Sequence, residues 1–418
     1  MPRIAYLECA RCGHHLSAET PQTLCPLDAG PLYVRYDLDD LRRSASRDNI
    51  ARYAADSATS LGMWRYRDVL PQAEPVTLGE GWTPLLASRR YPGLRLKEEG
   101  ANPTGSFKAR GLSLAVTMAR HYGLRHLAAP SAGNAASALA AYAARGGLSA
   151  HLFLPQDVPL ANHLEAELYG AELTLVDGLI SDCARLVTEA IAAQRDANVP
   201  PEEIWFDLST LKEPFRVEGK KTMGYELVEQ LGWQYPEAVF YPTGGGVGLI
   251  GMWKAFEEME ALGWVSGKRP RMYALQASGC APVAQAFDEG ASESRFFANA
   301  ATLAAGLRVP KPYGDSLILD IVRRSGGAVL ASSEEEILAS LKDWAAHEGL
   351  FLSPEGAAAT AAYDKLLTTG ELRSDDRVVL FNTGSGLKYT DTIAQALRLR
   401  RPHLLPRSLP VGGIITPV

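Results

Sequence analysis

Between residues 94 and 178, short runs of apolar residues alternate with longer stretches in which apolar residues recur at helical spacing. Short apolar runs have the length and composition of buried strands. The longer stretches between them have helical periodicity, and the first is opened by Ser106 and closed by Gly123. Strands that alternate with helices predict right-handed crossovers and a mostly parallel sheet. The predicted strands are 94–100, 126–132, 149–155 and 172–178, and the predicted helices are 106–124, 133–147 and 161–171.

A second block of the same alternation begins at residue 238 with AVFYPTGGGVGLIGMWKAFEEMEALG and continues through RMYALQA and RVVLFNTGSGLKY. Two such blocks predict two α/β domains, with the smaller one inserted into the larger. The last residues are rich in proline and glycine, which suits an extended arm. The predicted units are a ribbon-like extension at 1–35, a large domain at 36–115 and 205–400, a small α/β domain at 116–204, and a C-terminal arm at 401–418.

Three of the five cysteines fall within the extension at 1–35. Cys9 and Cys12 have the CxxC spacing of one half of a zinc-binding ribbon. The other half begins at Cys25 but lacks its second cysteine, so the extension is a degenerate zinc ribbon and we assign no metal ligand from sequence. A ribbon that has lost its metal and is held by packing remains the alternative. The candidates for a fourth ligand are Asp28, His14 and His15.

Composition narrows the class of protein further. The chain has 418 residues, of which 46% are hydrophobic and 22% charged, the usual balance of a globular protein. The net charge of -6 and the lack of a basic stretch argue against a nucleic-acid partner. No apolar run is long enough to cross a bilayer, and the N-terminal residues lack the apolar core of a signal peptide. We therefore expect a cytoplasmic protein with no membrane partner.

The stretch NPTGSFKARG, residues 102–111, turns on a proline and a glycine and places Lys108 beside Phe107. Lysine changes its pKa readily on burial, and a neutral lysine can form a Schiff base with a carbonyl compound. Lys108 is therefore a candidate anchor for a carbonyl cofactor. The stretch alone is equally compatible with a solvated surface lysine.

A glycine-rich turn, PTGGGVGLIG at 242–251, follows a predicted strand and opens a predicted helix. Free N–H groups at a helix start bind anions, and glycine lets the backbone approach a phosphate closely. The turn contains GxGxxG, but the next strand ends at Gln276 rather than at the acidic residue that a dinucleotide site requires. A small phosphate-bearing ligand therefore fits this turn better than NAD or ATP.

Two further strand-to-helix turns carry polar side chains. PSAGNAAS at 130–137 offers Asn134, and FNTGSGLKY at 381–389 offers Thr383 and Ser385. Open parallel sheets bind ligands at such turns, although each turn alone is also an ordinary helix cap. Other catalytic patterns are incomplete, because the SxxK at Ser209 lacks a KTG partner and neither HExxH nor GxSxG occurs.

Together these motifs resemble the fold-type II family of pyridoxal-phosphate enzymes, and within it the threonine synthases. The resemblance covers roughly residues 1 to 395 and implies a two-domain α/β fold with mostly parallel sheets. The family also implies a homodimer. The segments that carry the resemblance are LGEGWTPL at 78–85, NPTGSFKARG at 102–111, KEPFRVEGKKTMGYEL at 212–227 and TGSGLK at 383–388.

The resemblance also implies roles for individual residues toward pyridoxal 5'-phosphate. Lys108 forms the Schiff base and shuttles protons, and Asn134 hydrogen-bonds the phenolic oxygen of the cofactor. Thr383 faces the pyridine nitrogen, where a hydroxyl makes the ring a weaker electron sink than an aspartate would. The residues implied to hold the cofactor phosphate through their backbone amides are Gly244, Gly245, Gly246, Val247 and Gly248.

The implied reaction converts O-phosphohomoserine and water to threonine and phosphate. The small amino-acid substrate would lie against Ser131, Ala132 and Gly133, and Arg216 with Lys220 or Lys221 would bind its phosphate. From the residues alone, those three cations are better explained as an ordinary amphipathic helix face.

Two departures from the threonine synthase pattern favour an alternative reaction. The substrate turn has Ala132 and Ala135 where hydroxyl residues are common, and the centre of the phosphate turn is all glycine. Both features resemble threonine dehydratase and serine racemase. The alternative is therefore a dehydratase, or another enzyme of β-elimination or β-replacement.

Overall fold

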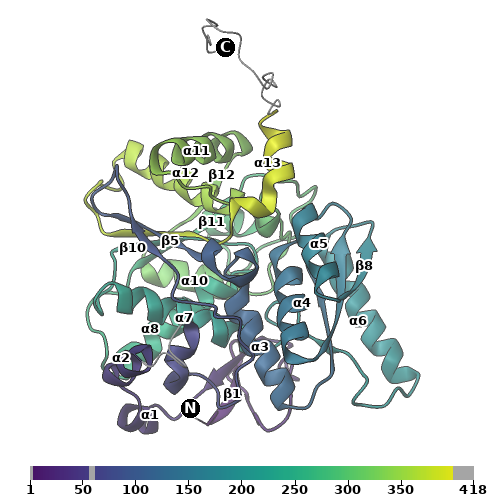
Figure 1. Cartoon of the computed structure of the whole chain (residues 1–418). Coiled ribbons are helices and arrows are strands. Elements are labelled where there is room, and N and C mark those ends of the chain that lie inside the picture. Colours follow the sequence, from purple (N-terminus) through teal and green to yellow (C-terminus); the bar gives the residue numbers. More distant parts are fainter. Residues whose placement is uncertain (1–2, 56–61, 399–418) are drawn as a thin grey trace, which may run out of the picture.

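The computed structural model describes residues 3–55 and 62–398, and Figure 1 shows their course from the N-terminal ribbon to the last helix. The described chain contains a three-stranded, a six-stranded and a four-stranded sheet. The two larger sheets confirm the α/β class that the alternation of strands and helices predicted. The predicted arm at 401–418 lies outside the described residues.

The six-stranded sheet has the order β12-β11-β10-β13-β5-β4. All neighbouring pairs from β12 to β5 are parallel, and β4 adds an antiparallel edge. Because β5 and β13 are parallel neighbours in register, with Glu98 opposite Asn382, the loops that follow them leave the sheet at the same edge. The strands are β4 (Leu85–Ala87), β5 (Leu94–Glu98), β10 (Ala238–Pro242), β11 (Arg271–Ala277), β12 (Val329–Ser332) and β13 (Val378–Asn382).

Helices cover both faces of this sheet, and the side chains of β10 alternate between two cores. Ala238 and Phe240 pack in the core closed by α11 and α12, whereas Val239 and Tyr241 pack in the core closed by α7, α8 and α10. A strand buried on both faces has no polar side, which explains its continuous apolar sequence. The helices are α7 (Phe215–Gln230), α8 (Val247–Ala261), α10 (Asp315–Ser325), α11 (Glu334–Glu348) and α12 (Pro354–Thr369).

The four-stranded sheet has the order β8-β7-β6-β9 and is parallel throughout. Helix α6 packs on one face, while α4 packs on the other and joins this sheet to α3 (Figure 1). The sheet falls within 116–204 except for β9, which follows directly, and the domain limits stay a prediction. The elements are β6 (His126–Pro130), α4 (Asn134–Gly146), β7 (Ser149–Pro155), α5 (Leu160–Leu168), β8 (Glu172–Val176), α6 (Ile180–Asp196) and β9 (Phe206–Asp207).

Helix α3 runs from Lys108 to His121, so it begins two residues after Ser106, where the sequence predicted its start. Ser106 is extended, with a φ of -162°, and forms an isolated bridge to Gly384. A long-range backbone pairing therefore overrides the capping preference of serine. The result is that Lys108 is the first residue of the helix rather than a residue of its interior.

The N-terminal ribbon is a small antiparallel sheet with the order β2-β1-β3, and it packs on the main core through Leu7 and Val34. Among the described residues, no helix is long and apolar enough to span a membrane. The remaining elements are β1 (Tyr6–Cys9), β2 (His15–Leu16), β3 (Leu32–Arg35), α1 (Leu38–Ser44), α2 (Arg47–Ala55), α9 (Pro282–Asp288), α13 (Thr390–Ala396) and the 3-10 helices η1 (Met63–Val69), η2 (Glu99–Ala101), η3 (Pro103–Gly105), η4 (Ala305–Leu307) and η5 (Gly386–Tyr389).

Candidate active site

A cavity of about 290 Å³ lies between the two larger sheets, at the ends of β6, β10 and β13. The turns that follow these three strands all line it, as expected for a ligand site of an open parallel sheet. All the site residues predicted from the sequence lie in its wall: Lys108, Ser131, Ala132, Gly133, Asn134, Arg216, Gly244, Gly245, Gly246, Val247, Gly248 and Thr383.

Lys108 is held in this cavity by pairing between two loops that are far apart in the sequence. The backbone N–H of Phe107 donates to the carbonyl oxygen of Thr383 at 3.1 Å, and that of Ser385 donates to Gly105 at 2.8 Å. Thr104 and Gly105 both adopt left-handed φ angles, of 60° and 63°, which turn the chain sharply before the helix. The predicted anchor and the predicted pyridine-facing hydroxyl therefore come from adjacent backbone segments.

The environment of Lys108 favours its neutral form. Burial in the cavity, followed by the positive charge of Arg216, lowers the pKa of Lys108 to about 7, while Glu355 acts in the opposite direction. The Nζ atom of Lys108 lies 4.2 Å from the centroid of the Phe107 ring, and the Nζ atom of Lys220 lies 4.1 Å from the same centroid. Lys108 lines the cavity and is only partly exposed, so it is not an ordinary solvated surface lysine, and its lowered pKa favours a nucleophilic amine.

A buried ionic network anchors α3 two residues beyond Lys108. Arg110 donates to Glu99 at 2.7 and 2.8 Å and to Glu226 at 2.8 Å through two of its nitrogens, and Lys97 donates to Glu226 at 2.5 Å. All four side chains are fully buried. Charged groups that are removed from water in this way need such mutual pairing, and the pairing fixes the start of α3 against α7.

Acidic residues from two of the segments that resemble threonine synthases add to this support. Glu226, from the segment at 212–227, accepts the backbone N–H groups of Trp82 and Thr83, from the segment at 78–85. Glu80 is also fully buried and accepts from Trp64, Ser113 and Tyr142 at 2.6 to 2.8 Å. Glu80 and Glu226 therefore support the site from behind, whereas other residues of the segment at 212–227 line the cavity itself.

The glycine-rich turn opens α8, and its conformation suits a bound phosphate. Gly246 is the N-cap with a left-handed φ of 76°, and a Cβ atom there would lie 2.3 Å from Cδ1 of Ile318. Only glycine fits this position, so the backbone stays bare where it faces the cavity. The first N–H groups of α8 lack partners within the helix and are available to an anion.

Unsatisfied polar atoms also point to a polar ligand in this cavity. Asn134 donates from Nδ2 to the hydroxyl of Tyr389 at 3.2 Å, and its buried Oδ1 has no hydrogen-bond partner among residues 3–55 and 62–398. Glu355 accepts through Oε1 from Tyr389 at 2.8 Å and from the N–H of Gly306 at 2.7 Å, whereas its buried Oε2 has none. Buried polar atoms without partners are costly, so a polar molecule fits here better than an empty or apolar cavity.

Arg216 contributes a buried cation to the same cavity. One terminal nitrogen donates to the carbonyl oxygen of Leu208 at 2.7 Å, and the buried Nε has no partner. Lys220 also lines the cavity, whereas Lys221 pairs with Glu218 at 2.5 Å and Glu258 at 2.9 Å. Helix α7 is buried on nearly all sides, so the alternative of an amphipathic surface face is wrong.

The sequence did not single out Glu355 and Tyr389. Glu355 lies in the first turn of α12 behind the N-cap Ser353, where a glutamate is an ordinary complement to the helix dipole. Tyr389 ends a 3-10 helix and shows no pattern beyond apolar burial. Only the tertiary fold brings these two side chains beside Asn134.

Comparison with known proteins places this fold and site in a family. Residues 76–384 match the family model described as pyridoxal-phosphate dependent enzyme, so the chain belongs to the family of pyridoxal-phosphate-dependent enzymes. Within this family it is 33% identical to threonine synthase from Methanocaldococcus jannaschii, over 93% of this chain and 94% of that protein. It is 36% identical to threonine synthase from Mycobacterium tuberculosis, over 78% of this chain and 88% of that protein.

A solved structure agrees at the level of the fold. Maize serine racemase superposes with a TM-score of 0.62 and 20% identity, covering 85% of this chain and 97% of that chain. An identity this low establishes the shared architecture and carries no information on the reaction. Pyridoxal phosphate is the cofactor that the family requires, and the glycine-rich turn at α8, Lys108 with its lowered pKa and the unsatisfied Asn134 are a fitting set of groups for it.

Proposed function

We propose that this protein is a threonine synthase, a carbon–oxygen lyase that converts O-phosphohomoserine and water to threonine and phosphate. The observation that carries the proposal is the buried Arg216, which has an unpartnered Nε in the same cavity as Lys108 and the glycine-rich turn. The backbone amides of the glycine-rich turn would bind the cofactor phosphate, so the cations Arg216 and Lys220 are available for a second phosphate, on the substrate. Similarity to threonine synthases over 93% of the chain supports the same reaction.

The cofactor would be held by groups at the start of α8, α3 and α4 and on the turn after β13. The backbone amides of Gly244 to Gly248 would bind its phosphate at the N-terminus of α8, Lys108 would hold its carbonyl carbon as a Schiff base, and Asn134 and Thr383 would bind the ring. When bound, pyridoxal phosphate supplies an electron sink that stabilises negative charge on the carbons of the substrate.

Lys108 would move the protons. Its pKa of about 7 leaves much of the amine neutral at neutral pH, so the freed amine can take the proton from Cα of the substrate. The same amine would take a proton from Cβ before the phosphate departs from Cγ, and protons would then be returned to Cγ and Cα to give the methyl group and the Cα–H bond of threonine. Water adds its oxygen to Cβ, and the balance is one water consumed for each phosphate released.

Arg216 and Lys220 would bind the substrate phosphate. A dianion gains most from charged donors that are already desolvated and fixed in place, and both side chains are buried beside the cavity. Ser131, Ala132 and Gly133 line the opposite turn, after β6, and would receive the amino-acid end of the substrate.

The dehydratase alternative drew on Ala132, Ala135 and the all-glycine phosphate turn. It is not favoured, because the curated relatives that cover most of the chain are threonine synthases. The likeness to serine racemase concerns the fold alone. Neither alanine removes a group that the cavity needs to bind a phosphate on the substrate.

The test offers O-phosphohomoserine, threonine and serine in parallel to the holoenzyme and follows inorganic phosphate, threonine and keto acid. The proposal expects phosphate and threonine in equal amounts from O-phosphohomoserine. Keto acid from threonine or serine, with no phosphate released from O-phosphohomoserine, would establish the dehydratase instead.

Three further proposals concern the whole molecule. We propose that the chain forms a homodimer and acts in the cytoplasm, as the resemblance and the composition led us to expect. We also propose that residues 116–204 form a small α/β domain inserted into the larger one. Sedimentation equilibrium tests the dimer, and limited proteolysis of the holoenzyme tests the domain limits.

A further inference from the structure

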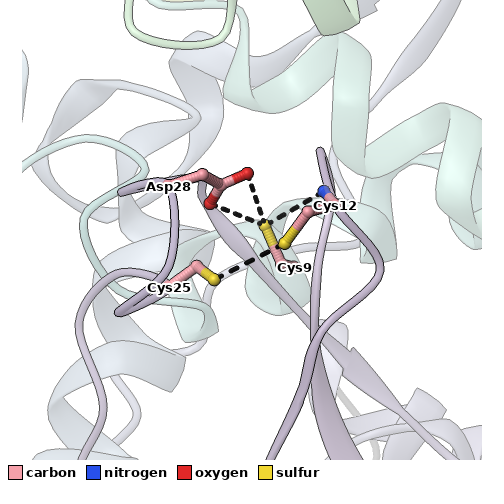
Figure 2. Close-up of side chains that lie close together, drawn as sticks. All are labelled: Cys9, Cys12, Cys25 and Asp28. Atoms are coloured by element: carbon pink, nitrogen blue, oxygen red, sulfur yellow. Dashed lines mark hydrogen bonds between the residues drawn. The ribbon is translucent and has the colours of Figure 1, made fainter.

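Three thiols and one carboxylate converge in the N-terminal ribbon, far along the sequence from the catalytic lysine. Cys9 ends β1 and Cys12 lies on the turn that follows it, while Cys25 and Asp28 lie on the segment before β3 (Figure 2). One ligand atom from each of the four residues can be chosen so that all lie within 4.8 Å of one another. The sequence alone had left the fourth ligand open.

The separations match the edges of a zinc tetrahedron. Zinc–sulfur bonds of about 2.3 Å and zinc–oxygen bonds of about 2.0 Å place two sulfurs about 3.8 Å apart and a sulfur and an oxygen about 3.5 Å apart. The observed separation of the Cys12 and Cys25 sulfurs is 3.7 Å. The Cys9 sulfur lies 3.3 and 3.6 Å from the two carboxylate oxygens of Asp28.

The backbone around the cluster is shaped to hold it. The N–H groups of Arg11 and Cys12 point at the Cys9 sulfur from 3.4 and 3.5 Å, and the N–H of Gly30 donates to Asp28 at 2.8 Å. Donors of this kind fix the orientation of metal ligands and favour their anionic forms. A Cβ atom on Gly30 would lie 2.5 Å from the Cys9 sulfur, so the close approach of the two turns requires glycine.

The competing explanations fit less well. A disulfide requires a sulfur–sulfur distance of about 2.05 Å, and all five cysteines are free. His14 and His15, the other candidates from sequence, are outside the cluster. His15 instead stacks on the Tyr6 ring, with 4.1 Å between the ring centroids.

We propose that Cys9, Cys12, Cys25 and Asp28 bind one zinc ion in a structural site. Four protein ligands leave no open position for water or substrate, which is the arrangement of a structural rather than a catalytic zinc. Three sulfurs favour zinc over calcium or magnesium, which bind through oxygen alone.

The site also has a direct connection to the active-site wall. Tyr313 lines the catalytic cavity, and its hydroxyl donates to the carbonyl oxygen of Ala29, the residue after Asp28. Arg11, which lies between Cys9 and Cys12, donates to the carbonyl oxygen of Tyr313 at 3.3 Å. The ion would therefore fix both turns against which this part of the cavity wall packs.

The test measures zinc in the full-length protein by elemental analysis after reconstitution with zinc and dialysis, and titrates the ion with a colorimetric chelator. We expect about one zinc per chain. Cobalt reconstitution should give the visible absorption of a tetrahedral thiolate site. Protein that retains no zinc, or that retains iron in preference to zinc under these conditions, would overturn the assignment.

Variants identify the ligands. Cys25→Ser should release the ion, and Asp28→Asn should weaken zinc binding by at least about 10-fold, since losing even an outer partner costs that much. Asp28→Cys should retain it. Cys280→Ser, a buried thiol elsewhere in the fold, and His14→Ala are the controls and should keep zinc unchanged. Unchanged zinc affinity in Asp28→Asn would remove Asp28 from the site, and this variant decides the matter even if Cys25→Ser does not fold.

Discussion

The backbone N–H of Phe107 donates to the carbonyl oxygen of Thr383 at 3.1 Å, across 276 positions of the sequence numbering. This bond joins the loop before α3 to the turn after β13, and it brings Lys108 to the wall that Thr383 forms. The parallel pairing of β5 with β13 makes the contact possible, because the loops after both strands leave the sheet at the same edge. The geometry of the cofactor site is thus a consequence of sheet order.

Lys108 should be the residue that holds the cofactor. Treatment of the holoenzyme with borohydride should attach pyridoxal phosphate irreversibly to Lys108, which peptide mass spectrometry can locate. Lys220 is the matched control, because it is a buried lysine in the same cavity whose pKa is also lowered by burial and by Lys108. Lys108→Ala should abolish covalent attachment and Lys220→Arg should preserve it. Label on Lys220 in the unmodified protein would refute the assignment.

Much of this site was accessible from sequence because its parts are local. The glycine-rich turn, the asparagine turn and the lysine loop each carry their signal within about ten residues of strand, turn and helix. The alternation of strands and helices then predicts that turns of one parallel sheet meet at one edge, as those after β10 and β13 do. Asn134 follows β6 of the other sheet, so its place in the same cavity depends also on how the two sheets pack.

Other features depend on contacts that no local pattern reveals. Ser106 has the residue type of a helix cap but pairs with Gly384 in an extended conformation, so α3 starts later than predicted. Glu355 looks like a routine first-turn acid, although its Oε2 is buried and unpartnered in the cavity. Asp28 becomes a fourth ligand candidate only because two turns of the ribbon face each other.

Arg216 should matter for the substrate phosphate. Arg216→Ala should lower kcat/KM for O-phosphohomoserine by about 30-fold or more, the equivalent of about 2 kcal/mol for a lost charged hydrogen bond to a dianion. Each variant is assayed at its own pH optimum, since Arg216 also affects the pKa of Lys108. Arg185→Ala is the control, because Arg185 is an exposed residue of α6 paired only with Glu189. Equal activity of the two variants would remove Arg216 from the substrate site.

The glycine-rich turn should need glycine at position 246 for two reasons, its left-handed φ angle and the lack of space for a Cβ atom. Gly246 and Gly263 stand at opposite ends of α8 with φ angles of 76° and 72°, but a Cβ atom would clash only at Gly246. Gly263→Ala should cost about 1–2 kcal/mol of unfolding free energy for its left-handed angle, and Gly246→Ala should cost more because of the clash with Ile318. Only Gly246→Ala should also weaken pyridoxal phosphate binding, by at least about 10-fold. Calorimetry and cofactor titration separate the two effects. Normal cofactor affinity in Gly246→Ala would contradict the proposal that the glycine-rich turn binds the cofactor phosphate.

The rate at which cofactor-free protein takes up pyridoxal phosphate should depend on pH through Lys108. The neutral amine reacts, so with a pKa of about 7 the rate should be constant well above pH 7 and fall about tenfold per unit below it. Arg216→Gln removes a charge that lowers this pKa and should move the midpoint to higher pH. Glu355→Gln removes a charge that raises it and should move the midpoint to lower pH. Stopped-flow absorbance measures the rate, and a midpoint near the ordinary lysine pKa would disprove the buried environment.

The most direct test of the proposed reaction follows oxygen atoms through a single turnover experiment in water enriched in heavy oxygen. The proposed lyase reaction breaks the bond between Cγ and oxygen and adds water at Cβ. Mass spectrometry should therefore find the heavy oxygen in the hydroxyl of threonine and none in the released phosphate. Heavy oxygen in the phosphate, together with unlabelled homoserine, would mean that water attacks phosphorus and that Lys108 and its cavity do not catalyse the reaction assigned to them.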